Sequence, residues 1–146
     1  RSKKQAIITP YDEVWIVVDS EEVTPEKIGK LNELIAKARK VKIKIALSYP
    51  SFEYWLLLHY VLKMKPYTNA DRVIEELRCH IPGYSKNIDN AETMIKERIV
   101  NAINNAELCR KIHENRDTKH SVPSTDVDLL VRCLNDSTRE HLRLFK

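Results

Sequence analysis

A five-residue apolar run, Val14-Trp-Ile-Val-Val18, leads directly into the acidic segment Asp19-Ser-Glu-Glu22. The run shows no polar alternation and is rich in β-branched residues, which predicts a buried strand. Open α/β sheets carry their chemistry outside the carboxyl ends of the strands. Carboxylates there suit a hard cation such as Mg²⁺, which takes one or two of them with waters and phosphate oxygens. A solvated loop before a helix explains the same acids, so the local pattern leaves both interpretations open.

The next segments predict a βαβ unit. Thr24-Pro25-Glu26 is typical of a helix start, because Thr caps, Pro takes the first helical position and Glu complements the helix dipole. Apolar residues then recur on one face as far as about Arg39. The segment 41–47 alternates apolar and charged residues, which predicts a second strand with one wet side. A strand, a helix and a strand in this order form a right-handed unit by default.

The rest of the chain reads as mostly helical. An apolar, largely buried helix is expected after Ser51, and the remaining helices are expected over 69–80, over 91–115 and after Ser124. The tail from Asn135 onward reads as a short or frayed helix. The predicted fold class is α/β, in one domain spanning 1–146, with a parallel-sheet part at 11–65 and a helical part at 66–146.

Composition narrows the function. A length of 146 residues suits one domain, and a net charge of +4 permits nucleic-acid binding without requiring it. The chain has two glycines and no Gly-rich motif, which argues against a P-loop or dinucleotide site. Three widely spaced cysteines favour reduced thiols in a cytoplasmic protein over a zinc knuckle. No apolar stretch approaches ~20 residues, so we expect no transmembrane helix.

One turn pattern occurs twice. Tyr49–Glu53 and Val122–Asp126 both read x-Pro-Ser-x-acid, and each opens an apolar helix. Helix capping by the serine and dipole compensation by the acid explain both copies without any further function. However, Glu53 follows the second strand and is therefore expected at the same sheet edge as Asp19. Backbone N–H groups at that helix start are able to receive a phosphate.

Four motifs in order resemble the RloB/AbiLii family of bacterial and phage-related defence loci, which is similar to TOPRIM nucleases of the OLD type. They are Tyr11-Asp-Glu-Val-Trp-Ile-Val-Val-Asp19, Ala46-Leu-Ser-Tyr-Pro-Ser-Phe-Glu-Tyr-Trp-Leu-Leu-Leu-His59, Pro82-Gly-Tyr-Ser-Lys86 and Pro123-Ser-Thr-Asp-Val127. The match runs from about Tyr11 to Leu134. It implies a TOPRIM-like α/β fold and a Mg²⁺- or Mn²⁺-dependent nuclease. Such an enzyme would cut DNA or RNA in anti-phage defence, beside a partner ATPase.

The resemblance also implies roles for individual residues. The D-x-D motif of the family falls on Asp19-Ser-Glu21, which makes Asp19, Glu21 and the following Glu22 the expected metal ligands. We assign catalysis to Asp19 and Glu21 with help from Glu53, and contact with substrate phosphate to Lys86. The remaining residues that we assign to substrate binding are Ser51, His59, Ser124 and Asp126. A solvated loop lysine and a hydrogen-bonded core histidine stay open as alternatives for Lys86 and His59.

The chain departs from the family at its beginning. The first strand of the family, with its acidic E-G-E-like motif, has no counterpart here, because residues 1–10 are too short and too basic to supply it. Either the sequence is a fragment, or this member has lost part of the catalytic set. The second function class is therefore a non-catalytic sensor on a degenerate TOPRIM fold that docks on a partner through its helical half. Homo-oligomers are compatible with either class.

Overall fold

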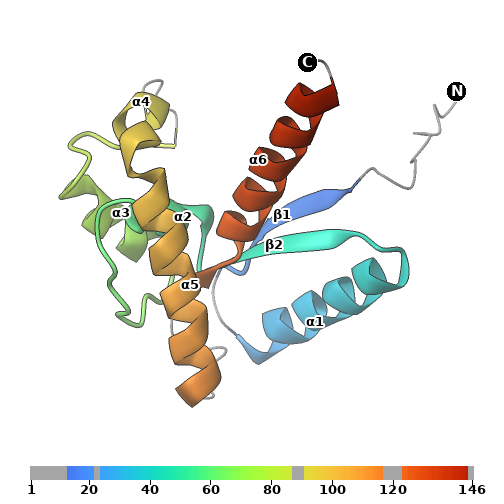
Figure 1. Cartoon of the computed structure of the whole chain (residues 1–146). Coiled ribbons are helices and arrows are strands. Elements are labelled where there is room, and N and C mark those ends of the chain that lie inside the picture. Colours follow the sequence, from blue (N-terminus) through green and yellow to red (C-terminus); the bar gives the residue numbers. More distant parts are fainter. Residues whose placement is uncertain (1–12, 22–23, 87–90, 117–122, 145–146) are drawn as a thin grey trace, which may run out of the picture.

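The computed structural model describes residues 13–21, 24–86, 91–116 and 123–144. Figure 1 shows the sheet and the helices around it. In chain order the elements are β1 (Trp15–Asp19), α1 (Pro25–Lys40), β2 (Lys44–Tyr49), α2 (Phe52–Leu57), α3 (Ala70–Arg78), α4 (Ala91–Ile95), the 3₁₀ turn η1 (Lys96–Arg98), α5 (Ile99–Arg116), β3 (Ser124–Thr125) and α6 (Val127–Leu144).

The three described strands form one sheet in the order β1-β2-β3. β1 and β2 are parallel, with Trp15 opposite Lys44 and Asp19 opposite Ser48. β3 pairs antiparallel with the end of β2, where Thr125 lies opposite Ser48. The βαβ unit and the mixed α/β class are therefore confirmed, and the carboxyl ends of the two parallel strands lie side by side.

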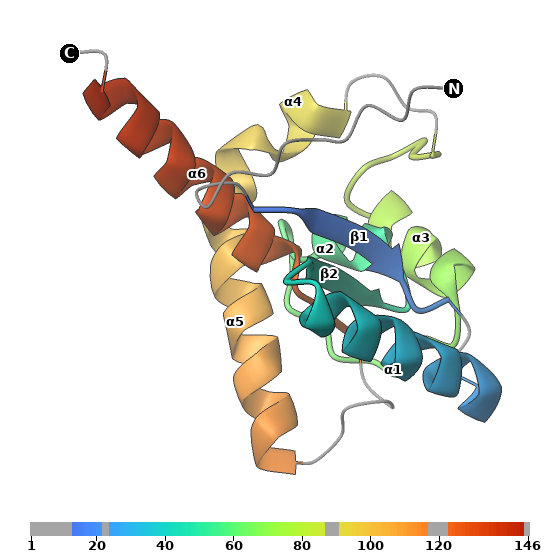
Figure 2. The ribbon, with the colours of Figure 1, turned by 90° about the vertical axis from the view of Figure 1, so that its right-hand side faces the viewer.

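Helices cover both faces of the sheet. In Figure 2, α1 lies in front of β2, and α2 and α3 lie behind it. Ala46 of β2 belongs to the main core together with Tyr54 and Leu57 of α2. The side chains of β2 that alternate with Ala46, such as Leu47, point to the other face, into a groove that is also lined by α1 and α6. The two faces of the sheet are therefore different environments, a packed core on the α2 side and an open groove on the α1 side.

The expected buried helix after Ser51 is confirmed, although it ends at Leu57. Every residue of α2 after Phe52 is buried, and Leu58 is also fully buried. The Tyr54 hydroxyl donates to the carbonyl of Lys63 at 3.1 Å, which folds the following segment back over the helix. α3 and α5 then pack on α2, where they contribute Val73, Leu77, Ala102 and Ala106 to the core.

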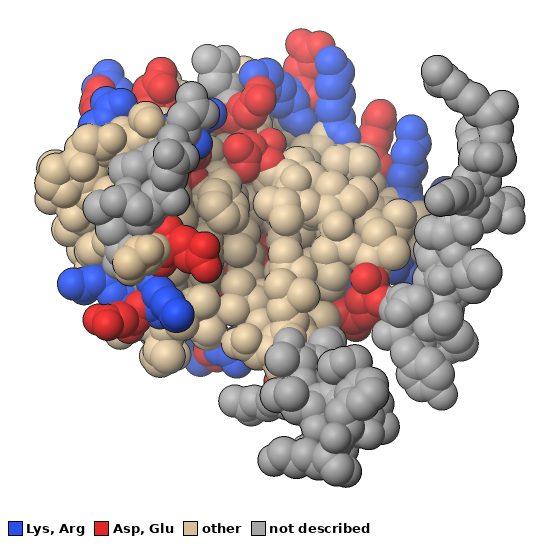
Figure 3. Space-filling view, turned by 90° about the horizontal axis from the view of Figure 1, so that it is seen from above, with Lys and Arg blue, Asp and Glu red and all other residues tan. Residues whose placement is uncertain are grey.

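The expectation that β1 is buried was wrong. β1 lies at the edge of the sheet, and Ile16 and Val17 are 38% and 48% exposed. Figure 3 views the molecule from above, onto the side where β1 lies in Figure 1, and shows a broad uncharged surface there. Burial of a strand depends on its neighbours as well as on its own residues, and β1 has a described neighbour on one side only.

Three expected boundaries also differ. β2 begins at Lys44 instead of residue 41, because Lys42 adopts a left-handed conformation (φ 57°) in the turn after α1. The helix expected over 91–115 is divided by η1 into α4 and α5. The tail after Asn135 continues α6 without a break to Leu144. In the described part of the chain, no helix combines the length and apolarity that crossing a bilayer requires.

Candidate functional site

Asp19 ends β1 and fixes the start of α2. Its Oδ1 atom accepts a hydrogen bond of 2.9 Å from the backbone N–H of Phe52, the first residue of the helix. Ser51 occupies the usual capping position but makes no side-chain cap bond. A strand carboxylate thus performs the role of a helix cap, and its negative charge faces the positive end of the helix.

Glu53 lies in the first turn of the same helix and is only 5% exposed. Its Oε2 atom is buried without a hydrogen-bond partner. Because an unpaired carboxylate oxygen is costly to bury, this atom favours a positive ligand that the protein itself does not provide.

Burial and neighbouring charges together disfavour the ionised form of Asp19. Its pKa is raised, first because its carboxyl is partly buried, and further because the negative charges of Glu53 and Glu21 lie nearby. The hydrogen bond from Phe52 and the positive charge of Lys86 act in the opposite direction without cancelling the rise. Lys86, although exposed, therefore lies within electrostatic range of Asp19, as its assignment to the site requires.

Glu21 lies near Asp19 and Glu53, but its side chain points away from them. Its backbone N–H donates to the carbonyl of Pro50 at 2.8 Å, and its φ of 58° is in the left-handed region. Its side chain is 73% exposed and lies 3.5 Å from the ammonium of Lys27. Glu21 therefore adds charge to the site and leaves its carboxylate in solvent. Glu22, the third expected metal ligand, lies outside the described residues.

Ser51 and His59 are both buried, each 1% exposed. The Nδ1 atom of His59 lies 2.9 Å from the carbonyl oxygen of Trp55, and its ring stands edge-on to the indole of Trp55. That contact assigns the proton to Nδ1, and burial lowers the pKa, so the ring is neutral at pH 7. Ser51 Oγ and His59 Nε2 have no hydrogen-bond partner. His59 is thus a hydrogen-bonded core histidine, the alternative to a role in substrate binding.

Ser124 and Asp126 are not brought to Asp19. Directly paired residues point to the same face of a sheet, so Asp19, Ser48 and Thr125 all face α2. The neighbours of Thr125 therefore face the opposite side, where Ser124 and Asp126 line a cavity of about 630 Å³ beside α1. Asp126 also lines the adjoining groove of about 890 Å³ between α1 and α6. The acids of the two copies of the turn motif thus lie on opposite faces of the sheet, Glu53 on the α2 side and Asp126 on the α1 side.

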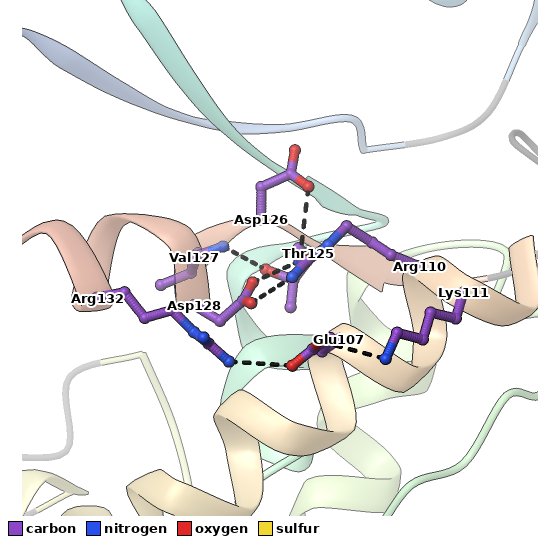
Figure 4. Close-up of polar contacts among 8 residues, drawn as sticks. All are labelled: Glu107, Arg110, Lys111, Thr125, Asp126, Val127, Asp128 and Arg132. Carbon is purple, nitrogen blue, oxygen red and sulfur yellow. Dashed lines mark hydrogen bonds and ion pairs between the residues drawn. The ribbon is translucent and has the colours of Figure 1, made fainter. Parts of the chain in front are cut away.

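A polar network supports β3 on that opposite side (Figure 4). Arg110 of α5 donates two hydrogen bonds to the fully buried carboxylate of Asp128 and one of 3.0 Å to the carbonyl of Thr125. The Nη1 atom of Arg110 lies 4.0 Å from the Oδ1 atom of Asp126. Burial raises the pKa of Asp126, and the charge of Arg110 opposes this effect. This network joins β3, α5 and α6 and is structural.

Tyr84 is a buried residue that feels the charge of Glu53, and the sequence analysis did not single it out. It is 6% exposed, and its pKa is raised by burial and by the negative charge of Glu53. Gly83, with φ 77°, provides the left-handed turn that precedes it. The Pro82-Gly-Tyr-Ser-Lys86 motif contains the signal, since it places Tyr84 two residues before Lys86. Only the folded chain links the motif electrostatically to the carboxylates, Tyr84 to Glu53 and Lys86 to Asp19.

The arrangement fits a divalent cation held by two carboxylates, those of Asp19 and Glu53. Within the described residues, no group of three His, Cys, Asp or Glu side chains is placed to hold an ion by itself. Mg²⁺ needs fewer protein ligands, because it keeps several waters and takes substrate phosphate oxygens. The unpaired Oε2 of Glu53 is the observation in favour of the cation, since a metal would compensate its burial.

Comparison with known proteins gives one positive finding. A family model described as RloB-like protein matches residues 1–134. No curated protein and no solved structure matches the chain.

Proposed function

The chain belongs to the RloB-like protein family, and from this premise we propose that it is a Mg²⁺-dependent nuclease, or the metal-binding portion of one, that hydrolyses phosphodiester bonds of DNA or RNA. The single observation that carries the proposal is the buried, unpartnered Oε2 of Glu53 beside the carboxylate of Asp19. A TOPRIM-like fold, a partner ATPase and a role in anti-phage defence are parts of the same proposal. They are supported by the order of the four motifs and by the parallel βαβ unit.

Each residue has a defined task in this proposal. Asp19 and Glu53 would hold the cation, and Glu21 would add negative charge from the solvent side. The ammonium of Lys86 would attract and hold a substrate phosphate as a point charge. When bound, the cation supplies an activated water and offsets charge on the leaving oxygen. The hydrogen bond from Phe52 keeps the carboxylate of Asp19 in place before substrate arrives.

Metal binding and cleavage test the proposal together. Titration with Mn²⁺ followed by calorimetry measures binding, and labelled DNA and RNA strands with Mg²⁺ or with EDTA measure cleavage. We expect Asp19→Asn and Glu53→Gln each to weaken Mn²⁺ binding at least tenfold and to abolish cleavage, because each removes one of two charged ligands. Asp136→Asn, which removes an exposed carboxylate from the groove on the other face, is the matched control and should behave like the wild type. Unchanged cleavage by Asp19→Asn would refute the metal assignment.

A non-catalytic sensor or partner-binding module is the second candidate. It is favoured by one observation, namely that only two described carboxylates converge where a self-sufficient metal site would need more. A wild-type chain that binds Mn²⁺ but cleaves neither DNA nor RNA would support this candidate over the nuclease.

A further inference from the structure

We propose that a basic surface at the far end of α2 from Asp19 binds the phosphate backbone of a nucleic-acid strand. The surface consists of Arg78, His80 and Arg98 with the ring of Tyr60, and we call it the Tyr60 surface. None of these residues has a role in the proposed metal site. The inference extends the proposed function and rests on it only for the choice of nucleic acid as the partner.

Tyr60 is the centre of the surface, because two basic side chains from other elements contact its ring. The centroids of the Tyr60 and His80 rings are 5.2 Å apart, and the two planes are stacked at 23°. The guanidinium carbon of Arg98 lies 4.7 Å from the centroid of the same tyrosine ring, a cation–π distance. His80 follows the end of α3 and Arg98 ends η1, so one ring joins the two elements and holds Arg98 in place.

Arg78, the last residue of α3, is held by a different contact. Its Nε atom donates a hydrogen bond of 3.1 Å to the carbonyl of Tyr84. No other described residue accepts from this guanidinium, so four of its five N–H donors remain for a ligand. A side chain that is already held in place loses less conformational entropy on binding than a free one, which favours contact with a ligand.

The two arginines of the surface are also uncompensated. Both Arg78 and Arg98 are exposed, and neither forms an ion pair with a described carboxylate. Arg72, on the same helix as Arg78, is instead paired with Glu75 at 3.4 Å. Two positioned guanidinium groups without carboxylate partners favour an anionic ligand. Phosphate fits them well, because a guanidinium binds it through two parallel hydrogen bonds.

The contacts of the Tyr60 ring decide which part of a nucleic acid is bound. Tyrosine often binds single strands by stacking on a base, which requires an open ring face. The ring of Tyr60 is only partly exposed and is already contacted by His80 and Arg98. The surface therefore offers its cations, which contact phosphates, and phosphates are the same for every base. We expect binding that is independent of base sequence and strongly dependent on salt.

The Tyr60 surface is near enough to the candidate site for one strand to contact both. α2 begins at Phe52, which holds the carboxylate of Asp19, and backbone hydrogen bonds continue its helical course to Tyr60. At 1.5 Å per helical residue, Phe52 and Tyr60 are about 12 Å apart. A stacked strand advances 3.4 Å per nucleotide, so about four nucleotides cover this distance.

The experiment measures oligonucleotide binding by the full chain in EDTA, where neither a cation nor cleavage contributes. Arg78→Gln and Arg98→Gln each remove one charge from the surface. Arg72→Gln is the matched control, because Arg72 is also exposed and belongs to α3, but is paired with Glu75. Fluorescence anisotropy with short labelled single-stranded DNA and RNA, over a series of salt concentrations, gives the affinity and its salt dependence. Thermal denaturation shows whether each variant is folded.

We expect Arg78→Gln and Arg98→Gln each to weaken binding about tenfold at low salt, for DNA and RNA alike. Each should also reduce the slope of log affinity against log salt by about 0.7 to 1, as loss of one phosphate contact does. Arg72→Gln should change neither quantity. Wild-type affinity in both surface variants, an equal loss in Arg72→Gln, or an unchanged salt slope would overturn the inference. The absence of oligonucleotide binding by the wild type in EDTA would also overturn it.

A conservative variant separates charge from structure. Arg98→Lys keeps the positive charge and should recover most of the affinity that Arg98→Gln loses. Binding by Arg98→Lys no better than by Arg98→Gln would contradict a phosphate contact, even if Arg98→Gln were poorly folded. The nuclease proposal fails separately, when the wild type does not cleave or Asp19→Asn still does. The EDTA result would then assign the Tyr60 surface to a nucleic-acid-binding module without catalysis.

Discussion

Breaking the ion pair between Arg110 and Asp128 should be among the most destabilising single changes in this chain. The carboxylate of Asp128 has no exposed area, and the side chain of Arg110 is 25% exposed. Arg110→Met would leave a buried charge without its partner and would remove the bond to the carbonyl of Thr125. Such a change costs about 3–5 kcal/mol of unfolding free energy. The predicted fall of the thermal midpoint for a chain of this size is about 10–15 °C.

The double variant Arg110→Met with Asp128→Leu separates the two contributions to this loss. Replacing a buried pair by apolar residues of similar size is often neutral, so the double variant should recover most of the lost stability. Urea denaturation followed by circular dichroism measures the unfolding free energies, and calorimetry measures the midpoints. A loss below about 1 kcal/mol for Arg110→Met would refute the reasoning, because that value is typical of a solvated surface pair. A double variant no better than the single one would show that the bond to Thr125 dominates instead.

Two further changes test the site through stability. The raised pKa of Asp19 means that folding disfavours its ionised form, so its contribution to stability falls as pH rises through the folded pKa. Without metal, Asp19→Asn should therefore be more stable than the wild type at pH 8 and should lose this advantage near pH 3. Urea denaturation at both pH values measures the difference. A larger advantage at pH 3 would contradict the raised pKa of Asp19. Glu21→Gly should add about 1 kcal/mol of stability by relieving φ 58°, which thermal denaturation would measure. Lys42→Gly, at φ 57°, is a second test of the same effect and should show a similar gain. No gain in either variant would contradict the strain argument.

Local chemistry made much of the fold predictable. Thr24 accepts a hydrogen bond from the backbone N–H of Lys27, and Pro25 begins α1, as the Thr-Pro-Glu sequence indicates. Asn69 caps α3 in the same way, through the N–H of Arg72. These features depend on a few consecutive residues, which is why a single sequence contains them.

Features that depend on neighbours across the fold were not predictable. The apolar run of β1 is compatible with a central strand or an edge strand, and only the sheet order decides between them. Glu53 and Asp126 occupy equivalent positions in identical patterns, yet one lies on the α2 side and the other in the groove beside α1. Their separation follows from the two-residue strand β3, whose alternation turns Asp126 away from the face that Thr125 shares with Ser48.

The hydrogen bond between Asp19 and Phe52 divides one carboxylate between two tasks. Oδ1 is committed to the helix, and among the described residues Oδ2 has no partner. The oxygen that maintains the fold is thus distinct from the oxygen that is free for chemistry. An asparagine at this position is able to keep the first contact and would present an N–H₂ group where the second oxygen was, which repels a cation. One substitution should therefore remove the proposed cation ligand while leaving the architecture intact, so residue 19 is the position at which the two candidate functions, metal-dependent nuclease and binding module, could be exchanged by a single change.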